Sequence, residues 1–213
     1  MNSIELHNTL PCVFEGRDVL SEIWLQDVTF RKGETYLVEA SSGTGKSSLC
    51  SYIIGYRKDY LGHISFDGKD IRKYGVSDWT SIRKNTLSLL FQELRLFPEL
   101  TAMENIEIKN GLINHKNRKE IEEWFERLGI ADKMDAKIGR MSFGQQQRVA
   151  MIRALVQPFD FLMVDEPISH LDDDNSVIMA SIMMEEVQRQ GAGVMVTSIG
   201  KHMDLPYTKT FRL

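Results

Sequence analysis

Residues 35–48 read Thr-Tyr-Leu-Val-Glu-Ala-Ser-Ser-Gly-Thr-Gly-Lys-Ser-Ser, and this stretch decides the fold. Thr35–Glu39 has the aliphatic and aromatic residues of a buried strand. A loop containing Gly43 and Gly45 follows it, and Ser47–Ile54 has the pattern of a helix. A strand that runs through such a loop into a helix presents successive backbone N–H groups to phosphate. The stretch therefore predicts an α/β fold with a phosphate-binding loop.

The loop supplies the groups that this binding requires. Gly43 and Gly45 allow the backbone to curl so that its N–H groups point inward. We expect Lys46 to neutralise the β- and γ-phosphates of ATP, and the Ser47 hydroxyl to bind Mg²⁺. The pattern departs from the usual one at its start, where Ala40 replaces a glycine. The predicted nucleotide-binding residues of the loop are Ala40, Ser41, Ser42, Gly43, Thr44, Gly45, Lys46, Ser47 and Ser48.

A second motif, Phe-Leu-Met-Val-Asp-Glu-Pro, occupies Phe161–Pro167. Its apolar residues predict a strand that delivers Asp165 to its carboxyl end, where open α/β sheets bind ligands. We expect Asp165 to hold Mg²⁺ through water, and Glu166 to act as the general base that polarises the attacking water. An acidic pair after a strand is usually only a solvent-exposed strand end. The phosphate-binding loop favours the functional interpretation.

Strand-like and helical segments alternate along the rest of the chain. Further strands are predicted at Ile4–Leu6, Ile23–Phe30, His63–Phe66, Thr86–Phe91, Gly193–Thr197 and Thr210–Leu213. Further helices are predicted from Thr101 to Leu128 with a break at Gly111–Asn117, from Ser142 to Leu155, and at Asn175–Arg189. This alternation predicts a mostly parallel sheet. The Asp67-Gly68 turn indicates a hairpin near the N-terminus.

We therefore predict a P-loop NTPase core with a mostly parallel sheet, an N-terminal antiparallel β subdomain and an inserted helical subdomain. The whole chain, residues 1–213, is expected to form one domain. Its ATP-binding core would comprise residues 1–92 and 140–213, and its helical subdomain approximately residues 93–139.

Composition limits the possible partners. The chain is 42% hydrophobic and 26% charged, which is typical of soluble globular proteins, and its net charge is -4. It offers no overall basic field for nucleic acid, so no nucleic-acid partner is expected. The apolar runs are too short to cross a bilayer, and no secretory signal opens the chain. A cytoplasmic location follows as the expectation.

A third motif, Met-Ser-Phe-Gly-Gln-Gln-Gln-Arg, occupies residues 141–148. Ser142 and Gln145 have the spacing of a capping box, so helix capping explains the motif about as well as a functional role does. A second consideration favours function. Ser142 and Gly144 have no obvious task in a lone chain, because N–H and hydroxyl groups at a helix N-terminus favour an anion.

In their order and spacing, the three motifs resemble the ATP-binding-cassette ATPases over nearly the whole chain. By this resemblance Ser142, Gly144 and Gln145 belong to the signature loop, which contacts ATP. Phe143 stands in place of the first of two glycines in that loop. Gln92 matches the glutamine that reaches Mg²⁺ and the nucleophilic water.

Two further positions follow from the resemblance. Residues 169–172, Ser-His-Leu-Asp, match the D-loop, which crosses between subunits. Phe14 lies where the family places an aromatic ring that stacks on adenine. The implied catalytic residues are Glu166, Gln92 and Lys46, and the implied metal-binding residues are Ser47, Gln92 and Asp165.

The chain departs from the family at one catalytic position. The family carries a histidine that contacts the γ-phosphate directly after the strand matching Val194–Thr197, but here Ser198 follows it. The nearest histidine is His202, which is most simply an exposed polar residue. Serine can donate a hydrogen bond but cannot carry a positive charge or reach as far. We therefore expect slow ATP hydrolysis, unless His202 substitutes.

The resemblance implies that two subunits, identical or different, sandwich ATP head to tail. Leu94–Ile106 resembles the subfamily of lipoprotein-releasing and macrolide-export ATPases. The implied function is the ATP-hydrolysing subunit of a transporter, peripheral on the inner face of the membrane. A separate membrane permease would contact the region after Gln92 and the helical insert.

Two other functions stay open. Ala40, Phe143 and Ser198 are also compatible with a nucleotide-gated regulatory subunit that binds ATP but scarcely hydrolyses it, although Glu166 is retained. A soluble ATPase acting on nucleic acid or ribosomes is disfavoured by the single cassette and the acidic balance.

Overall fold

The central sheet is parallel. The structure, a computed structural model, describes residues 1–168 and 173–213. Within these residues the strand order of the sheet is β6-β7-β8-β3-β9. Its strands are β3 (Thr35–Glu39), β6 (Leu87–Leu90), β7 (Phe161–Asp165), β8 (Gly193–Ser198) and β9 (Lys209–Arg212). All its strand pairs run parallel, so their carboxyl ends meet at one edge. The predicted α/β class is confirmed.

A second sheet is antiparallel and has the order β2-β1-β4-β5. Its strands are β1 (Ser3–Pro11), β2 (Asp27–Arg31), β4 (Tyr60–Phe66) and β5 (Lys69–Asp70). Asp67 and Gly68 join β4 to β5 with φ angles of 48° and 76°. Two consecutive positive φ angles suit the twist of a two-residue hairpin. The predicted N-terminal antiparallel subdomain is thereby confirmed.

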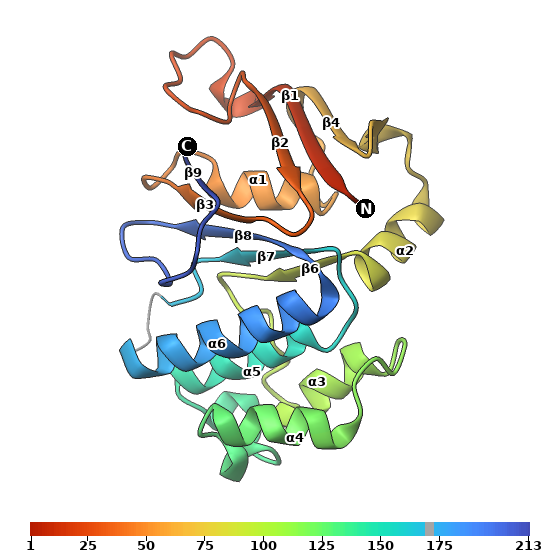
Figure 1. Ribbon diagram of the computed structural model, residues 1–213, viewed down its shortest axis with the longest axis vertical. Coiled ribbons are helices and arrows are strands. Elements are labelled where there is room, and N and C mark those ends of the chain that lie inside the picture. Colours follow the sequence, from red (N-terminus) through yellow and green to blue (C-terminus); the bar gives the residue numbers. More distant parts are fainter. Residues whose placement is uncertain (169–172) are drawn as a thin grey trace.

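Helices fill the space between the sheets and cover the outer face of the parallel sheet (Figure 1). Leu49 of the first helix shares a core with Val38 of β3 and Ile4 of β1. Leu37 enters the other core, which also contains Val149 of the helical layer, because alternate residues of a strand face opposite ways. The helices are α1 (Lys46–Ile53), α2 (Val76–Asn85), α3 (Ala102–Asn110), α4 (Arg118–Arg127), α5 (Phe143–Leu155) and α6 (Asp173–Gln190).

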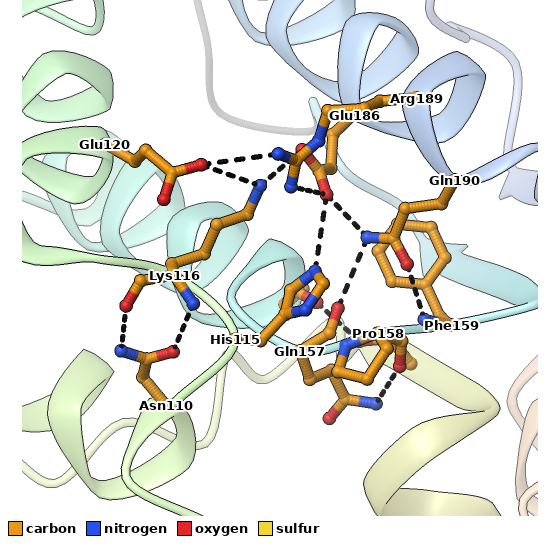
Figure 2. Close-up of polar contacts among 12 residues, drawn as sticks. Asn110, His115, Lys116, Glu120, Gln157, Pro158, Phe159, Glu186, Arg189 and Gln190 are labelled. Carbon is orange, nitrogen blue, oxygen red and sulfur yellow. Dashed lines mark hydrogen bonds and ion pairs between the residues drawn. The ribbon is translucent and has the colours of Figure 1, made fainter. Parts of the chain in front are cut away.

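A buried polar network joins the helical insert to α6, as Figure 2 shows. The Lys116 Nζ atom, between α3 and α4, donates to Glu186 Oε2 of α6 over 2.7 Å. The Asn110 side chain of α3 bonds both the N–H and the carbonyl of Lys116, at 3.0 and 2.8 Å. The insert is therefore held against the sheet-covering helix by charge as well as by apolar contact.

Two sequence predictions about the elements need correction. The strand predicted at Ile23–Phe30 begins only at Asp27, because Ile23 and Trp24 are buried in the segment that connects β1 to β2. Helix α2 was not predicted, since Trp79 is its only residue classed as buried. Of the helices that the structure describes, none has the length and apolar character needed to cross a membrane.

Candidate nucleotide-binding site

Four neighbouring strands deliver the predicted site residues to one edge of the parallel sheet. The phosphate-binding loop follows β3, and Ser198 ends the adjacent strand β8. Asp165 ends β7, the next strand, and Gln92 follows β6 beyond it. Residues far apart in the sequence thus meet at the carboxyl edge, which is where open α/β sheets bind ligands.

A cavity of about 530 Å³ opens at this edge. Its floor is the phosphate-binding loop, and Phe14 of the N-terminal subdomain also lines it. The Phe14 position suits the predicted contact with adenine, a role that stays a prediction. The lining residues are Val13, Phe14, Arg17, Ser41, Ser42, Gly43, Gly45, Lys46, Ser47, Ser48, Gln92, Glu166 and Ile199.

Lys46 is the charged centre of the site. Its side chain is only 6% exposed, and its Nζ atom lies 2.8 Å from Asp165 Oδ1 and 2.6 Å from Glu166 Oε1. Burial lowers the pKa of Lys46, but the hydrogen bonds and charges of the two carboxylates outweigh burial and raise the pKa above its usual value. The lysine is therefore charged and faces the acids that follow β7.

Hard oxygen atoms meet beside this lysine. Ser47 Oγ lies 3.3 Å from Asp165 Oδ2, and Thr197 Oγ1 donates to Asp165 Oδ1 over 2.5 Å. The Thr197 bond from β8 orients the carboxylate. Hydroxyl and carboxylate oxygens are ligands that Mg²⁺ prefers, so the residues present fit the predicted metal.

Glu166 is held from two sides. Its Oε1 atom pairs with Lys46, and its Oε2 atom accepts a hydrogen bond of 3.0 Å from Gln92 Nε2. Its backbone is unusual, because its φ of 49° is one that residues other than glycine rarely adopt. Strained backbone of this kind persists where surrounding contacts fix it and is concentrated at functional sites. The predicted base and the predicted glutamine are thus direct neighbours.

Neither Ser198 nor His202, the two residues considered for contact with the γ-phosphate, lines the cavity. Ser198 is 2% exposed, and its hydroxyl donates to the Lys201 carbonyl. His202 is exposed and packs edge-on against Tyr207, with ring centres 5.8 Å apart. His202 lines a separate groove beside α6, whereas Ile199 lines the cavity at the phosphate-binding loop.

The signature residues are not part of this cavity. Ser142 caps α5 in the predicted capping box: its hydroxyl accepts from the Gln145 N–H at 3.3 Å, and its own N–H donates to Gln145 Oε1 at 2.9 Å. Ser142 therefore does have a task in a lone chain, contrary to the expectation from sequence. Gly144 is half-buried in the first turn of α5, beside the 42% exposed Phe143. The predicted D-loop, residues 169–172, lies outside the described residues.

A second hollow, which we call the basic groove, was not predicted in detail. It has a volume of about 380 Å³ and lies between the end of β6, α3 and the segment after α1. Among the described residues that line it, every charged side chain is basic: Arg83, Arg95, Lys109 and Arg153. Tyr56, Phe97, Ile108 and Leu112 add exposed apolar surface. These residues are spread over the sequence, so no local motif reveals them.

Comparison with known proteins agrees with this geometry. Residues 26–169 match the family model described as ABC transporter. The chain is 30% identical over 186 residues to the macrolide export ATP-binding/permease protein MacB 1/2 of Paracoccus denitrificans, covering 86% of this chain and 28% of that protein. It is 30% identical to the ABC transporter ATP-binding protein YknY of Bacillus subtilis, covering 81% of this chain and 76% of that one.

Solved structures give the same result. A dimeric structure of MJ0796, a bacterial ABC transporter cassette, superposes with a TM-score of 0.76 at 25% identity, covering 92% of this chain and 87% of that one. A post-hydrolysis state of the same cassette, bound to ADP and Pi, gives a TM-score of 0.73. The chain spans only about a quarter to a half of the length of the first curated relatives, 28% and 56%. Its motifs, its fold and these likenesses together show that the chain belongs to the ABC transporter family as an ATP-binding cassette.

Proposed function

We propose that the chain hydrolyses ATP and couples closure of a cassette pair to a separate membrane permease. The observation that carries this proposal is the convergence of Lys46, Asp165, Glu166 and Gln92 at the cavity floored by the phosphate-binding loop. A positive group for phosphate, an acid for the metal and a base for water are the parts that phosphoryl transfer to water requires.

Each residue has a step in this proposal. Phe14 stacks on adenine, and the N–H groups of the loop and Lys46 bind the phosphates. Glu166 takes a proton from water while the water oxygen bonds to the γ-phosphorus. The bond from that phosphorus to the bridging oxygen then breaks, leaving ADP and phosphate. Gln92, already bonded to Glu166, orients the water.

Ser47 and Asp165 would hold Mg²⁺, which supplies charge neutralisation of the phosphates when bound. Before ATP can bind fully, Lys46 has to exchange its contact with Glu166 for one with phosphate. This exchange releases the carboxylate for its work as a base. While Lys46 is paired with Glu166, the carboxylate is not free to act as a base. It becomes free only when nucleotide is bound.

Hydrolysis should be slow. The Ser198 hydroxyl is occupied by the Lys201 carbonyl, and His202 lines another groove. The γ-phosphate would thus lack the cationic imidazole that other members of the family supply. Slow turnover leaves a nucleotide-gated regulatory subunit as the second candidate function, favoured by this same observation.

A single-turnover assay tests the proposed activity and separates the two candidates. The chain, in excess over radiolabelled ATP with Mg²⁺, should release phosphate, and Glu166→Gln should stop the release while ATP binding by calorimetry is retained. Equal, near-zero rates for the two proteins, with ATP bound by both, would identify the regulatory subunit instead. Failure of both proteins to bind ATP would overturn the nucleotide site itself.

We further propose a second cassette subunit as partner, identical or different. Ser142 is exposed, Gly144 and Gln145 are half-buried, and all three lie outside their own chain's cavity, so a second chain could use them to close it. Sedimentation of Glu166→Gln should show a dimer with ATP and a monomer with ADP. Gly144→Asp, which places a negative charge facing phosphate, should stay monomeric in both. A dimer that forms equally without ATP would contradict this arrangement.

The basic groove is the proposed contact surface for the permease, which would place the chain at the inner face of the membrane. Exposed apolar residues in a groove whose charged side chains are all basic fit a short amphipathic segment with acidic side chains. Ile108→Asp should abolish co-purification with a multi-span protein encoded beside this chain. Val76→Asp, the same change at a still more exposed apolar residue on α2, should not. Equal retention by both variants would refute the surface.

A further inference from the structure

Trp24 is a buried residue that contacts the phosphate-binding loop from outside the cavity. Its side chain is 1% exposed, and its indole Nε1–H donates to the Thr44 carbonyl over 2.9 Å. Trp24 is absent from the residues that line the cavity, whereas its neighbours across the loop, Gly45 and Phe14, line it. The tryptophan thus lies behind the loop.

The segment that carries Trp24 is itself firmly held. The Ser21 hydroxyl accepts hydrogen bonds from the N–H groups of Ile23 and Trp24, at 3.0 and 2.9 Å. The Leu25 N–H donates to the Thr9 carbonyl of β1 over 2.9 Å. These bonds fix the indole relative to the antiparallel sheet. Trp24 can therefore act as a fixed support for a loop that would otherwise be free to tilt.

The bond to Thr44 determines where the next N–H group points. The peptide bond between Thr44 and Gly45 is planar and trans, so its C=O and its N–H point in opposite directions. With the carbonyl turned toward Trp24, the Gly45 N–H is turned away from it. Within residues 1–168 and 173–213, no group accepts a hydrogen bond from that N–H.

Gly45 is also confined sterically. Its φ is 96°, a conformation that glycine adopts readily. A methyl group built on it would lie 3.1 Å from the Phe14 ring and 3.2 Å from the Trp24 ring. The two aromatic rings therefore both pack against the Gly45 Cα and leave little room for a side chain there.

We propose that Trp24 is a positioning residue, whose indole N–H holds the Thr44 carbonyl so that the Gly45 N–H faces the phosphates of the nucleotide. This inference rests on the proposed nucleotide site. It assigns the orientation of the loop to a side chain in the β1–β2 connection, 20 residues before Thr44 in the sequence. An N–H group that is already aimed loses little freedom when phosphate binds.

Trp24→Phe removes the N–H and keeps an aromatic ring, and Trp79→Phe is its matched control. Trp79 is also buried, and within the described residues its Nε1 atom has no hydrogen-bond partner. Calorimetry would compare the binding of ATP and of inorganic tripolyphosphate, each with Mg²⁺, well below the Tm of each variant. We expect Trp24→Phe to weaken both by about three- to tenfold, the size of one neutral hydrogen bond. Trp79→Phe should leave both unchanged.

Phe14→Ala completes the design, because it should weaken ATP and leave tripolyphosphate unaffected. If Trp24→Phe behaves like Trp79→Phe, or weakens ATP alone as Phe14→Ala does, Trp24 does not position the loop. If the unmodified chain binds neither probe, the nucleotide site fails before this inference is reached.

A second measurement covers the case in which Trp24→Phe does not fold. The unmodified chain has three tryptophans, whose indole N–H signals in a ¹⁵N spectrum can be assigned with Trp79→Phe and Trp124→Phe. Tripolyphosphate should shift the Trp24 signal and leave that of Trp79 in place. An unmoved Trp24 signal at saturation would overturn the proposal.

Discussion

Lys116→Met should be severely destabilising, because it leaves the carboxylate of Glu186 buried without its closest cation. The two side chains are 1% and 4% exposed, and their charged atoms lie 2.7 Å apart (Figure 2). Removing one partner of a buried ion pair typically costs about 3–5 kcal/mol. Arg189 stays 3.0 Å from the same carboxylate, and burial raises the pKa of Glu186 to about 7, so the acid can also take up a proton. We therefore expect the lower end, about 3 kcal/mol.

Urea denaturation measures this cost as a change in the free energy of unfolding at constant m-value. The matched control is Arg118→Met, whose pair with Glu122 is 61% and 39% exposed. That change should leave the free energy of unfolding almost unchanged, because solvent screens an exposed pair. The double variant Lys116→Met with Glu186→Met should recover most of the loss, since no charge is left unpaired. A loss for Lys116→Met no larger than that for Arg118→Met would refute the reasoning.

The remaining predictions concern turnover and pH. Ser198→His should raise the rate of single-turnover hydrolysis severalfold. His202→Ala should leave the rate of the chain unchanged, because His202 lies outside the cavity. Ordinary turnover that His202→Ala abolishes would show instead that His202 takes part in hydrolysis. Burial, aided by the charge of Arg153, lowers the pKa of Lys109 to about 7. The folded chain then binds fewer protons than the unfolded chain above that pH, so the free energy of unfolding should rise from pH 7 towards pH 10. Lys109→Met should flatten that rise in urea titrations at several pH values, and an unchanged slope would contradict the assigned pKa.

The meeting of Lys46, Asp165 and Glu166 at one edge of the sheet was predictable from sequence, because its signals are local. The strand, glycines and helix around Lys46 are consecutive, and Asp165 with Glu166 ends an apolar run. Parallel strands bring such strand ends to one edge whatever their separation in the chain. Gln92 was expected at the site only from the resemblance to the ATP-binding-cassette ATPases, and its direct hydrogen bond to Glu166 was not expected.

Other features depend on contacts that no local pattern encodes. Helix α2 is mostly exposed and contributes Trp79 alone as a buried residue, so it lacks a strong apolar period. Trp24 could be expected to be buried, but its bond to Thr44 depends on how the antiparallel subdomain sits over the loop. The buried pair of Lys116 and Glu186 is separated by 70 residues and required the packed structure.

The crystal structure of Glu166→Gln with Mg²⁺ and ATP tests the central claim most directly. The account predicts a triphosphate in the cavity above the phosphate-binding loop, with adenine against Phe14. The Lys46 Nζ atom should have left position 166, where it now lies 2.6 Å from the carboxylate, and should contact the β- and γ-phosphates. A nucleotide bound elsewhere, or a bound triphosphate that Lys46 does not contact, would contradict it.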